Sequence, residues 1–161
     1  MGILASSKGV RRVTMPQESP LEILDQLEVQ EQCVESDAST AALRDLVNRL
    51  EGYFLGENPS FPDALDVEGT PFQTEVWEVV RSIPYGETRS YSWVAKQIER
   101  PGSARAVGQA MRANPVSIVV PCHRVIGANG DLRGYGGSGG VNMKRWLLDL
   151  ERVNGPQLRV Q

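Results

Sequence analysis

A cysteine and a histidine stand side by side in the run Pro121-Cys122-His123-Arg124. A thiol becomes a strong nucleophile as the thiolate, and a nearby imidazole can accept its proton directly or through water. His123 is the only histidine of the chain, so the pair predicts a nucleophilic Cys122. The alternative is a structural cysteine packed behind a strand, with His123 as a surface neighbour.

The segment before this pair predicts how the thiol is presented. Ile118–Val120 is apolar and β-branched, which favours a short buried strand. Because proline cannot extend a sheet ladder, Pro121 should turn the chain and leave Cys122 at the edge of the core.

Two short helices upstream, predicted over Ser90–Ile98 and Ala104–Ala113, have the layout of a helix-turn-helix. The tight turn Glu99–Gly102 joins them. Ser103 can cap the second helix, which must end before Pro115.

The second helix has little side-chain bulk along much of its length, at Ala104, Ala106, Gly108 and Ala110. Small side chains let a helix backbone approach another surface closely, which suits the narrow minor groove of DNA, although the same face could pack on a neighbouring helix. Arg105 could reach a phosphate or fill the gap left when a base leaves the stack.

The charge is unevenly distributed along the chain. The net charge is -3, but residues 1–68 carry -8 (5 basic, 13 acidic) and residues 69–161 carry +5 (12 basic, 7 acidic). This split favours a polyanion as partner of the second part, although a solvated surface can show the same imbalance. We expect two domains, 1–68 and 69–161, with Asn58–Gly69 as linker.

The first domain is predicted to hold a β-hairpin and a helix. Ile3–Ala5 and Val10–Met15 form the hairpin, with the turn near Gly9. A helix capped by Ser39 or Thr40 runs to Gly56, with an apolar face of Leu43, Leu46, Val47, Leu50 and Phe54.

The second domain adds elements on both sides of the helix-turn-helix. A helix begins at Thr70-Pro71 and buries Phe72, Val76, Val79, Val80 and Ile83. Asn129-Gly130 predicts a hairpin of Arg124–Ala128 with Asp131–Tyr135. The helix Val141–Glu151 closes the domain, with Met143, Trp146, Leu147 and Leu150 facing inward. The fold class is therefore α/β (α+β): a small sheet-plus-helix domain, then a helical, winged helix-turn-helix-like DNA-binding domain.

Several classes of protein are disfavoured. No run approaches the ~18 apolar residues of a membrane span, and the N-terminus does not read as a signal peptide. Cys33 and Cys122 are the only cysteines, and without a C-x-x-C or Cys/His cluster we expect no disulfide framework, metal site or cofactor. Because no export signal is found, we expect a cytoplasmic location, and because no apolar heptad stands out, we expect a monomer.

Three motifs together resemble the O6-alkylguanine-DNA alkyltransferase family, also named methylated-DNA–protein-cysteine methyltransferases. They are Gly86-Glu-Thr-Arg-Ser-Tyr91, Ala104-Arg-Ala-Val-Gly-Gln-Ala-Met-Arg-Ala-Asn114-Pro115 and Val120-Pro-Cys122-His123-Arg124-Val125-Ile. The resemblance covers about residues 70–151 and is most specific around Pro121–Val125. The first domain resembles the family only loosely.

The resemblance implies a role for each matching residue. Cys122 would accept the alkyl group, His123 would deprotonate it through a bound water, Glu151 would orient that histidine, and Asn114 would brace the turn before the active-site strand. Tyr91 would crowd the phosphate beside the lesion and contact the flipped base, and Arg105 would fill its vacancy. The remaining implied contacts are Ala104, Ala106, Gly108 and Arg112 with DNA, and Val125, Tyr135, Gly136 and Gly137 in the base pocket.

The implied activity is direct reversal of DNA damage in double-stranded DNA, through the minor groove. The base is flipped out of the stack, because an alkyl group on O6 of guanine lies where no buried thiol can reach it. Cys122 then takes the group as a thioether, so each molecule reacts once. The alternatives are a winged-helix protein that binds lesions without chemistry and a Cys122–His123 hydrolase. The loop Gly136–Gly140 is about two residues longer than is usual in the family, and the preferred alkyl size stays open.

Overall fold

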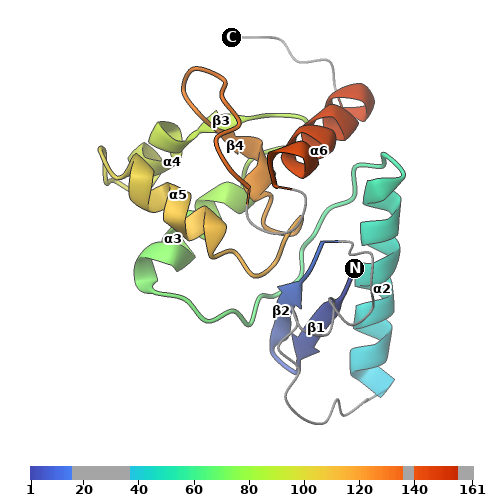
Figure 1. The fold of residues 1–161 in the computed structure, drawn as a ribbon. Coiled ribbons are helices and arrows are strands. Elements are labelled where there is room, and N and C mark those ends of the chain that lie inside the picture. The colour runs from blue at the N-terminus through green and yellow to red at the C-terminus, as the bar shows by residue number, and fades with distance from the viewer. Residues whose placement is uncertain (16–36, 136–139, 156–161) are drawn as a thin grey trace. The chain divides into compact units, whose positions relative to one another are not determined.

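The computed structural model describes residues 1–15, 37–135 and 140–155 (Figure 1). Its helices and small sheets confirm the expected α+β class. In chain order the elements are β1 (Ile3–Ser6), β2 (Gly9–Val13), α2 (Asp37–Phe54), α3 (Pro71–Arg81), β3 (Arg89–Ser90), α4 (Tyr91–Gln97), α5 (Ala104–Arg112), the 3-10 helix η1 (Cys122–Arg124), β4 (Val125–Ile126) and α6 (Gly140–Asn154).

The chain forms two compact units. The first comprises Met1–Glu68 together with Pro115–Ser117, and the second comprises Gly69–Asn114 and Ile118–Gln161. The short segment Pro115–Ser117 therefore belongs to the first unit, although the sequence on both sides of it belongs to the second.

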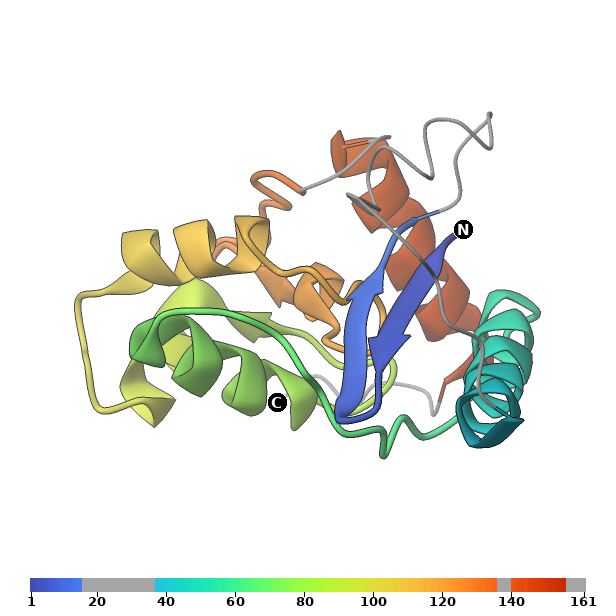
Figure 2. The same cartoon turned by 90° about the horizontal axis from the view of Figure 1, so that it is seen from below.

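The hairpin of β1 and β2 is the sheet of the first unit (Figure 2). Its return strand begins at Gly9, where φ is +151° and a Cβ atom would collide with the carbonyl oxygen of Ala64. The chain continues pairing beyond the hairpin, because the Val13 N–H donates to Pro115 O (2.9 Å) and the Ser117 N–H donates to Val13 O (3.3 Å). These bonds hold Pro115–Ser117 beside β2.

Helix α2 packs on β1 in the same unit. It begins at Asp37, so the predicted cap at Ser39 or Thr40 is wrong. Its buried residues include Leu46 and Leu50, as expected, and also Tyr53. The predicted linker is tied down, since Arg49 forms a bidentate ion pair with Asp63 at 2.6 and 2.8 Å.

Helices α3, α4 and α5 pack against one another in the second unit (Figures 1 and 2). Thr70 caps α3, as predicted, and Gln73 completes a capping box that the sequence analysis did not predict. The buried Trp77 donates its indole N–H to Ala110 O in α5 (2.9 Å). Ser90 caps α4. Ser103 does not cap α5, because its hydroxyl donates instead to Arg100 O (2.8 Å).

Two predicted β elements are wrong. Ile118–Val120 is buried but forms no strand: Ile118 and Val119 form a turn and Val120 is an isolated bridge residue. Ile118 has φ +72°, an uncommon conformation for a β-branched residue. The Asn129-Gly130 turn exists, closed by Gly127 N–H donating to Asp131 O (2.7 Å), but its flanks form no hairpin. Val125–Ile126 pairs with Arg89–Ser90 in parallel instead.

Helix α6 turns a partly charged face inward. Lys144, Leu147 and Glu151 are its buried residues, whereas Trp146, expected inside, is 47% exposed. The prediction failed because it placed only apolar side chains in the core. No helix among the described residues is long and apolar enough to cross a membrane.

Candidate active site

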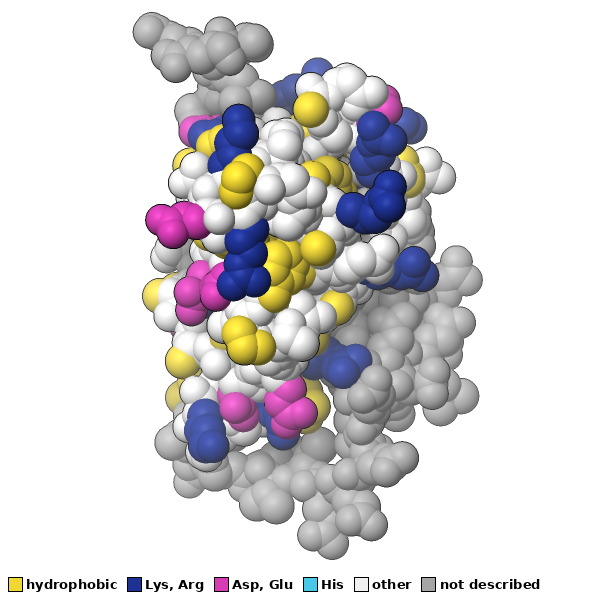
Figure 3. Space-filling view, turned by 90° about the vertical axis from the view of Figure 1, so that its left-hand side faces the viewer, with side chains coloured by type: hydrophobic (Ala, Val, Ile, Leu, Met, Phe, Trp, Pro, Cys, Tyr) yellow, Lys and Arg dark blue, Asp and Glu magenta, His cyan; other side chains and the backbone are white. Residues whose placement is uncertain are grey.

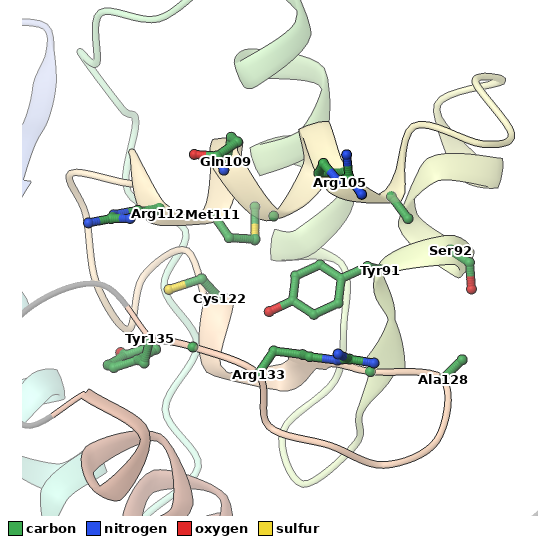
Figure 4. A pocket seen from close by; sticks show the side chains of 14 residues that line it. Tyr91, Ser92, Arg105, Gln109, Met111, Arg112, Cys122, Ala128, Arg133 and Tyr135 are labelled. Carbon is green, nitrogen blue, oxygen red and sulfur yellow. The ribbon is translucent and has the colours of Figure 1, made fainter.

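The turn after the buried segment 118–120 places Cys122 at a pocket. Cys122 begins η1, where its N–H donates to Val120 O (2.8 Å) and the Arg124 N–H donates to Pro121 O (2.9 Å). Cys122 is only 7% exposed but lines a pocket of about 840 Å³ (Figure 4). The pocket lies in the second unit, between the start of α4, helix α5 and residues 127–135, which we call the pocket loop.

His123 is fully buried beside a carboxylate. Its Nε2 lies 2.7 Å from Glu151 Oε1, and both side chains are inaccessible to solvent. Arg124 binds the same carboxylate through Nε (2.9 Å to Oε2) and a terminal nitrogen (2.9 Å to Oε1). The Gly86 N–H donates to Oε2 as well (2.9 Å). The Glu151 carboxylate thus accepts hydrogen bonds from three residues, His123, Arg124 and Gly86.

These contacts decide which groups are charged. Burial alone would raise the pKa of Glu151, but hydrogen bonds from His123 and Arg124 lower it far below its ordinary value, so Glu151 is ionised. Burial lowers the pKa of His123, although the hydrogen bond to Glu151 opposes the shift. The imidazole at rest is therefore neutral. Because a carboxylate can only accept, Nε2 carries the hydrogen and Nδ1 is the basic nitrogen.

The surroundings of Cys122 both oppose and assist ionisation. Burial raises the pKa of the thiol, while hydrogen bonds from Asn114 and Tyr135 and the charge of Lys144 act in the other direction. The Asn114 amide donates to Cys122 Sγ (3.4 Å) and to Val120 O (3.0 Å), which fixes the turn. The resting thiol is thus protonated beside donors that would stabilise a thiolate.

The other residues predicted from the sequence lie mostly around the same pocket. Tyr91, Ala104, Arg105, Gly108, Arg112 and Tyr135 line it. Ala106 is exposed on α5 but does not line the pocket, and Val125 is fully buried next to η1. Gly136 and Gly137 lie outside the described residues. Within the described part of the chain, no group of three His, Cys, Asp or Glu side chains could hold a metal ion.

The family model of the 6-O-methylguanine DNA methyltransferase DNA-binding domain matches residues 71–153. The chain belongs to this family. A methylated-DNA–protein-cysteine methyltransferase of Mycobacterium bovis is 55% identical over 115 residues, which are 71% of this chain and 68% of the relative.

Solved methyltransferase structures agree with the fold. The crystal structure of a Mycobacterium tuberculosis O6-methylguanine methyltransferase matches with a TM-score of 0.70 and 40% identity, covering 97% of this chain and 94% of that one. A structure of OGT from the same organism in complex with DNA matches with a TM-score of 0.65 and 55% identity, covering 70% of this chain and 68% of that one.

Sequence reasoning assigned no role to two buried cations of this methyltransferase site, Arg124 and Lys144. Lys144 is 0% exposed and donates to Val125 O (2.7 Å), Leu132 O (2.8 Å) and Gly134 O (3.3 Å). Burial lowers its pKa to about 8. Its ammonium joins the pocket loop to α6. The sequence feature that could have revealed it is the position of Lys144 on the same face of α6 as the buried Leu147. The sequence-based prediction assumed that this face carried no charge.

Proposed function

We propose that Cys122 is the alkyl acceptor of a direct-reversal DNA repair reaction, in which an alkyl group moves from O6 of guanine to the protein. The observation that carries this proposal is the thiol of Cys122 at the wall of a pocket, backed by the buried His123–Glu151 pair. The activity is that of a methylated-DNA–protein-cysteine S-methyltransferase, as the relatives are named.

The substrate base reaches the thiol by leaving the duplex. Extrusion of a nucleotide costs a few kcal/mol, and less where an alkylated base pairs poorly. Arg105 projects from the first turn of α5, where it fills the vacancy left in the stack. Tyr91 lines the pocket with Cys122 (Figure 4). In this proposal it contacts the flipped base there.

Proton transfer then activates the nucleophile. The neutral imidazole of His123 accepts the thiol proton at Nδ1 through a water molecule, and Glu151 balances the resulting imidazolium. The thiolate attacks the alkyl carbon, so the S–C bond forms as the C–O6 bond breaks, and the electron pair stays on guanine, which takes up a proton. A thioether is not reversed by any group of this site, so each molecule reacts once.

The proposal also covers the DNA groove that the protein binds, its oligomeric state and its cellular location. Helix α5, with Ala104 and Gly108 at the pocket and Arg112 in its last turn, faces the minor groove. The protein acts on double-stranded DNA as a monomer without a cofactor. It acts in the cytoplasm, since a free nucleophilic thiol needs a reducing compartment to persist.

A protein that binds lesions without chemistry is the alternative function. It would need no activated nucleophile, whereas Cys122 here has an acid–base partner within its own 3-10 helix. A Cys–His hydrolase is disfavoured, because that function leaves the packed helices α3, α4 and α5 unexplained.

Duplex DNA carrying radiolabelled O6-methylguanine separates these functions. We expect label on the protein in a 1:1 ratio, located on Cys122 by peptide mapping and intact mass. Cys122→Ala should lose all transfer but keep duplex affinity within about threefold, because alanine removes the nucleophilic sulfur and leaves the proposed DNA contacts of α5 in place. Label released as methanol would indicate hydrolysis, and label retained on DNA would indicate binding alone. Transfer by Cys122→Ala would contradict the proposal.

A further inference from the structure

The pocket has an arginine that the proposed mechanism does not use. Arg133 lies on the pocket loop and lines the pocket together with Tyr91 and Cys122. In Figure 4 its side chain extends beneath the Tyr91 ring, on the opposite side of the pocket from Arg105 on α5. The two arginines therefore flank the space that a flipped nucleotide would enter.

The guanidinium of Arg133 is available to a ligand. Its side chain is 61% exposed, and its ion pair with Asp131 is long, at 3.8 Å, and equally open to solvent. Such a pair contributes little energy and is easily exchanged. The charge of Arg133 acts on the site: burial and the charge of Cys122 raise the pKa of Tyr91, and Arg133 opposes that rise.

The backbone at Arg133 is also unusual. Its φ is +62°, in the left-handed region that non-glycine residues seldom adopt. The loop folds tightly there, since a Cβ on Gly127 would lie 3.1 Å from Arg133 Nε and 3.0 Å from Asp131 O. Strained residues of this kind gather at ligand-binding sites, where the surrounding structure fixes them.

The charge around the pocket indicates the class of ligand. Among the described residues, the pocket lining contains Arg105, Arg112 and Arg133 but no aspartate or glutamate. Figure 3 views the side on which α4 and α5 are drawn in Figure 1: basic side chains lie on both sides of an apolar area there, with acidic side chains farther to the left and below. A pocket mouth with one sign of charge concentrates ligands of the other sign.

We propose that Arg133 binds a backbone phosphate beside the flipped nucleotide, which rests on the proposed function of the same pocket. Rotating a nucleotide into the pocket brings its own phosphates to the mouth. In the proposed function, Arg105 on α5 fills the vacancy in the base stack and is not available for this phosphate. Arg133 supplies the cation on the other side, where it fixes the strand and carries no sequence information.

Arg133→Gln tests the phosphate contact, with Arg152→Gln as control. Arg152 is 70% exposed in the last turn of α6 and lies outside the pocket lining, and both changes remove one positive charge. On the Cys122→Ala background, Arg133→Gln should weaken binding to an O6-methylguanine duplex roughly tenfold at low salt. It should also reduce the slope of log affinity against log salt by about 0.9, the value for one phosphate. The control should change neither.

The free base O6-benzylguanine distinguishes a phosphate contact from a base contact. With Cys122 present, Arg133→Gln should lower the ratio of the duplex transfer rate to the free-base transfer rate at least about fivefold. Equal loss on both substrates, or a salt slope unchanged from that of the control, would overturn the phosphate assignment. Absence of any transfer by the unsubstituted protein would instead refute the proposed function, whatever the salt slopes show.

Discussion

At the scale of single residues, Glu151 is the most heavily used group of the site. Its carboxylate accepts from His123, from Arg124 and from the Gly86 N–H, and all of its surface is buried. Arg124 also donates to Ile83 O (2.7 Å) and lies over the Tyr85 ring. Buried charges persist where every partner is satisfied, so the loss of one partner leaves an uncompensated charge.

Glu151→Gln should therefore destabilise the protein by about 3–5 kcal/mol at pH 7. The pKa of Glu151 is lowered in the folded state, so its ionised form contributes stability above the ordinary value of 4.5. That contribution is lost as pH falls below 4.5 toward the folded-state value. Urea unfolding at pH 7 and at pH 4 should thus show a gap between variant and wild type that narrows at pH 4.

The neighbouring exposed acid of α6 provides the control for this comparison. Asp149 is 53% exposed and pairs with Arg152 at the surface, so Asp149→Asn should shift stability by less than about 0.5 kcal/mol at either pH. A gap for Glu151→Gln that is constant between pH 7 and pH 4 would contradict the assigned ionisation.

At the scale of elements, sequence motifs predicted a helix or strand correctly where its formation depends only on neighbouring residues. The Thr70-Pro71 start of α3 needs only its own turn, and it forms as predicted. The hairpin at Asn129-Gly130 failed because its outcome depends on a residue more than ten positions away. Lys144 binds the carbonyls of Val125, Leu132 and Gly134, and no local pattern encodes that contact.

Lys144→Met should loosen the pocket loop without unfolding the helices around it. The amides of Gly127 and Gly130, which close the loop turn, should exchange hydrogen roughly tenfold faster, while exchange in α3 and α5 stays unchanged. Alkyl transfer should fall about tenfold, because the cation near the Cys122 thiolate is lost as well.

Arg145→Met is the matched control, since Arg145 is exposed and adjacent on α6. It should leave both loop exchange and transfer within about twofold of wild type. If the loop amides of Lys144→Met kept their protection, the ammonium would not be what holds the loop.

At the scale of the whole molecule, the sequence indicated two regions of opposite charge but not the path of the chain between them. Cys122 and His123, with Glu151 as their carboxylate, were recognisable by residue type and motif. The excursion of Pro115–Ser117 into the first unit was not, because it rests on main-chain hydrogen bonds with Val13 that no side-chain pattern marks. The stretch of chain between Asn114 and Cys122 therefore includes three residues, Pro115–Ser117, that are held by hydrogen bonds in the first unit.

The charge of the second unit predicts the response of DNA binding to salt. Raising salt from 50 to 200 mM should weaken duplex binding about tenfold or more, as expected when about two phosphates are neutralised. Arg112→Gln, in the last turn of α5, should lower the slope of log affinity against log salt by about 0.9. Lys8→Gln, an exposed change in the first unit, should not alter the slope. An affinity independent of salt would remove the electrostatic argument.

The burial of Cys122 also affects how long the protein keeps an unmodified thiol before it meets damaged DNA. A protein that works once is wasted by every stray oxidant or electrophile that meets its sulfur. Peroxides and soluble alkylating agents attack the ionised, accessible form. Cys122 is only 7% exposed and its thiol holds its proton at rest, so it offers them little of that form. Burial keeps the thiol protonated until His123 accepts its proton. It thereby protects the one reactive thiol from side reactions, so that it remains able to react with DNA.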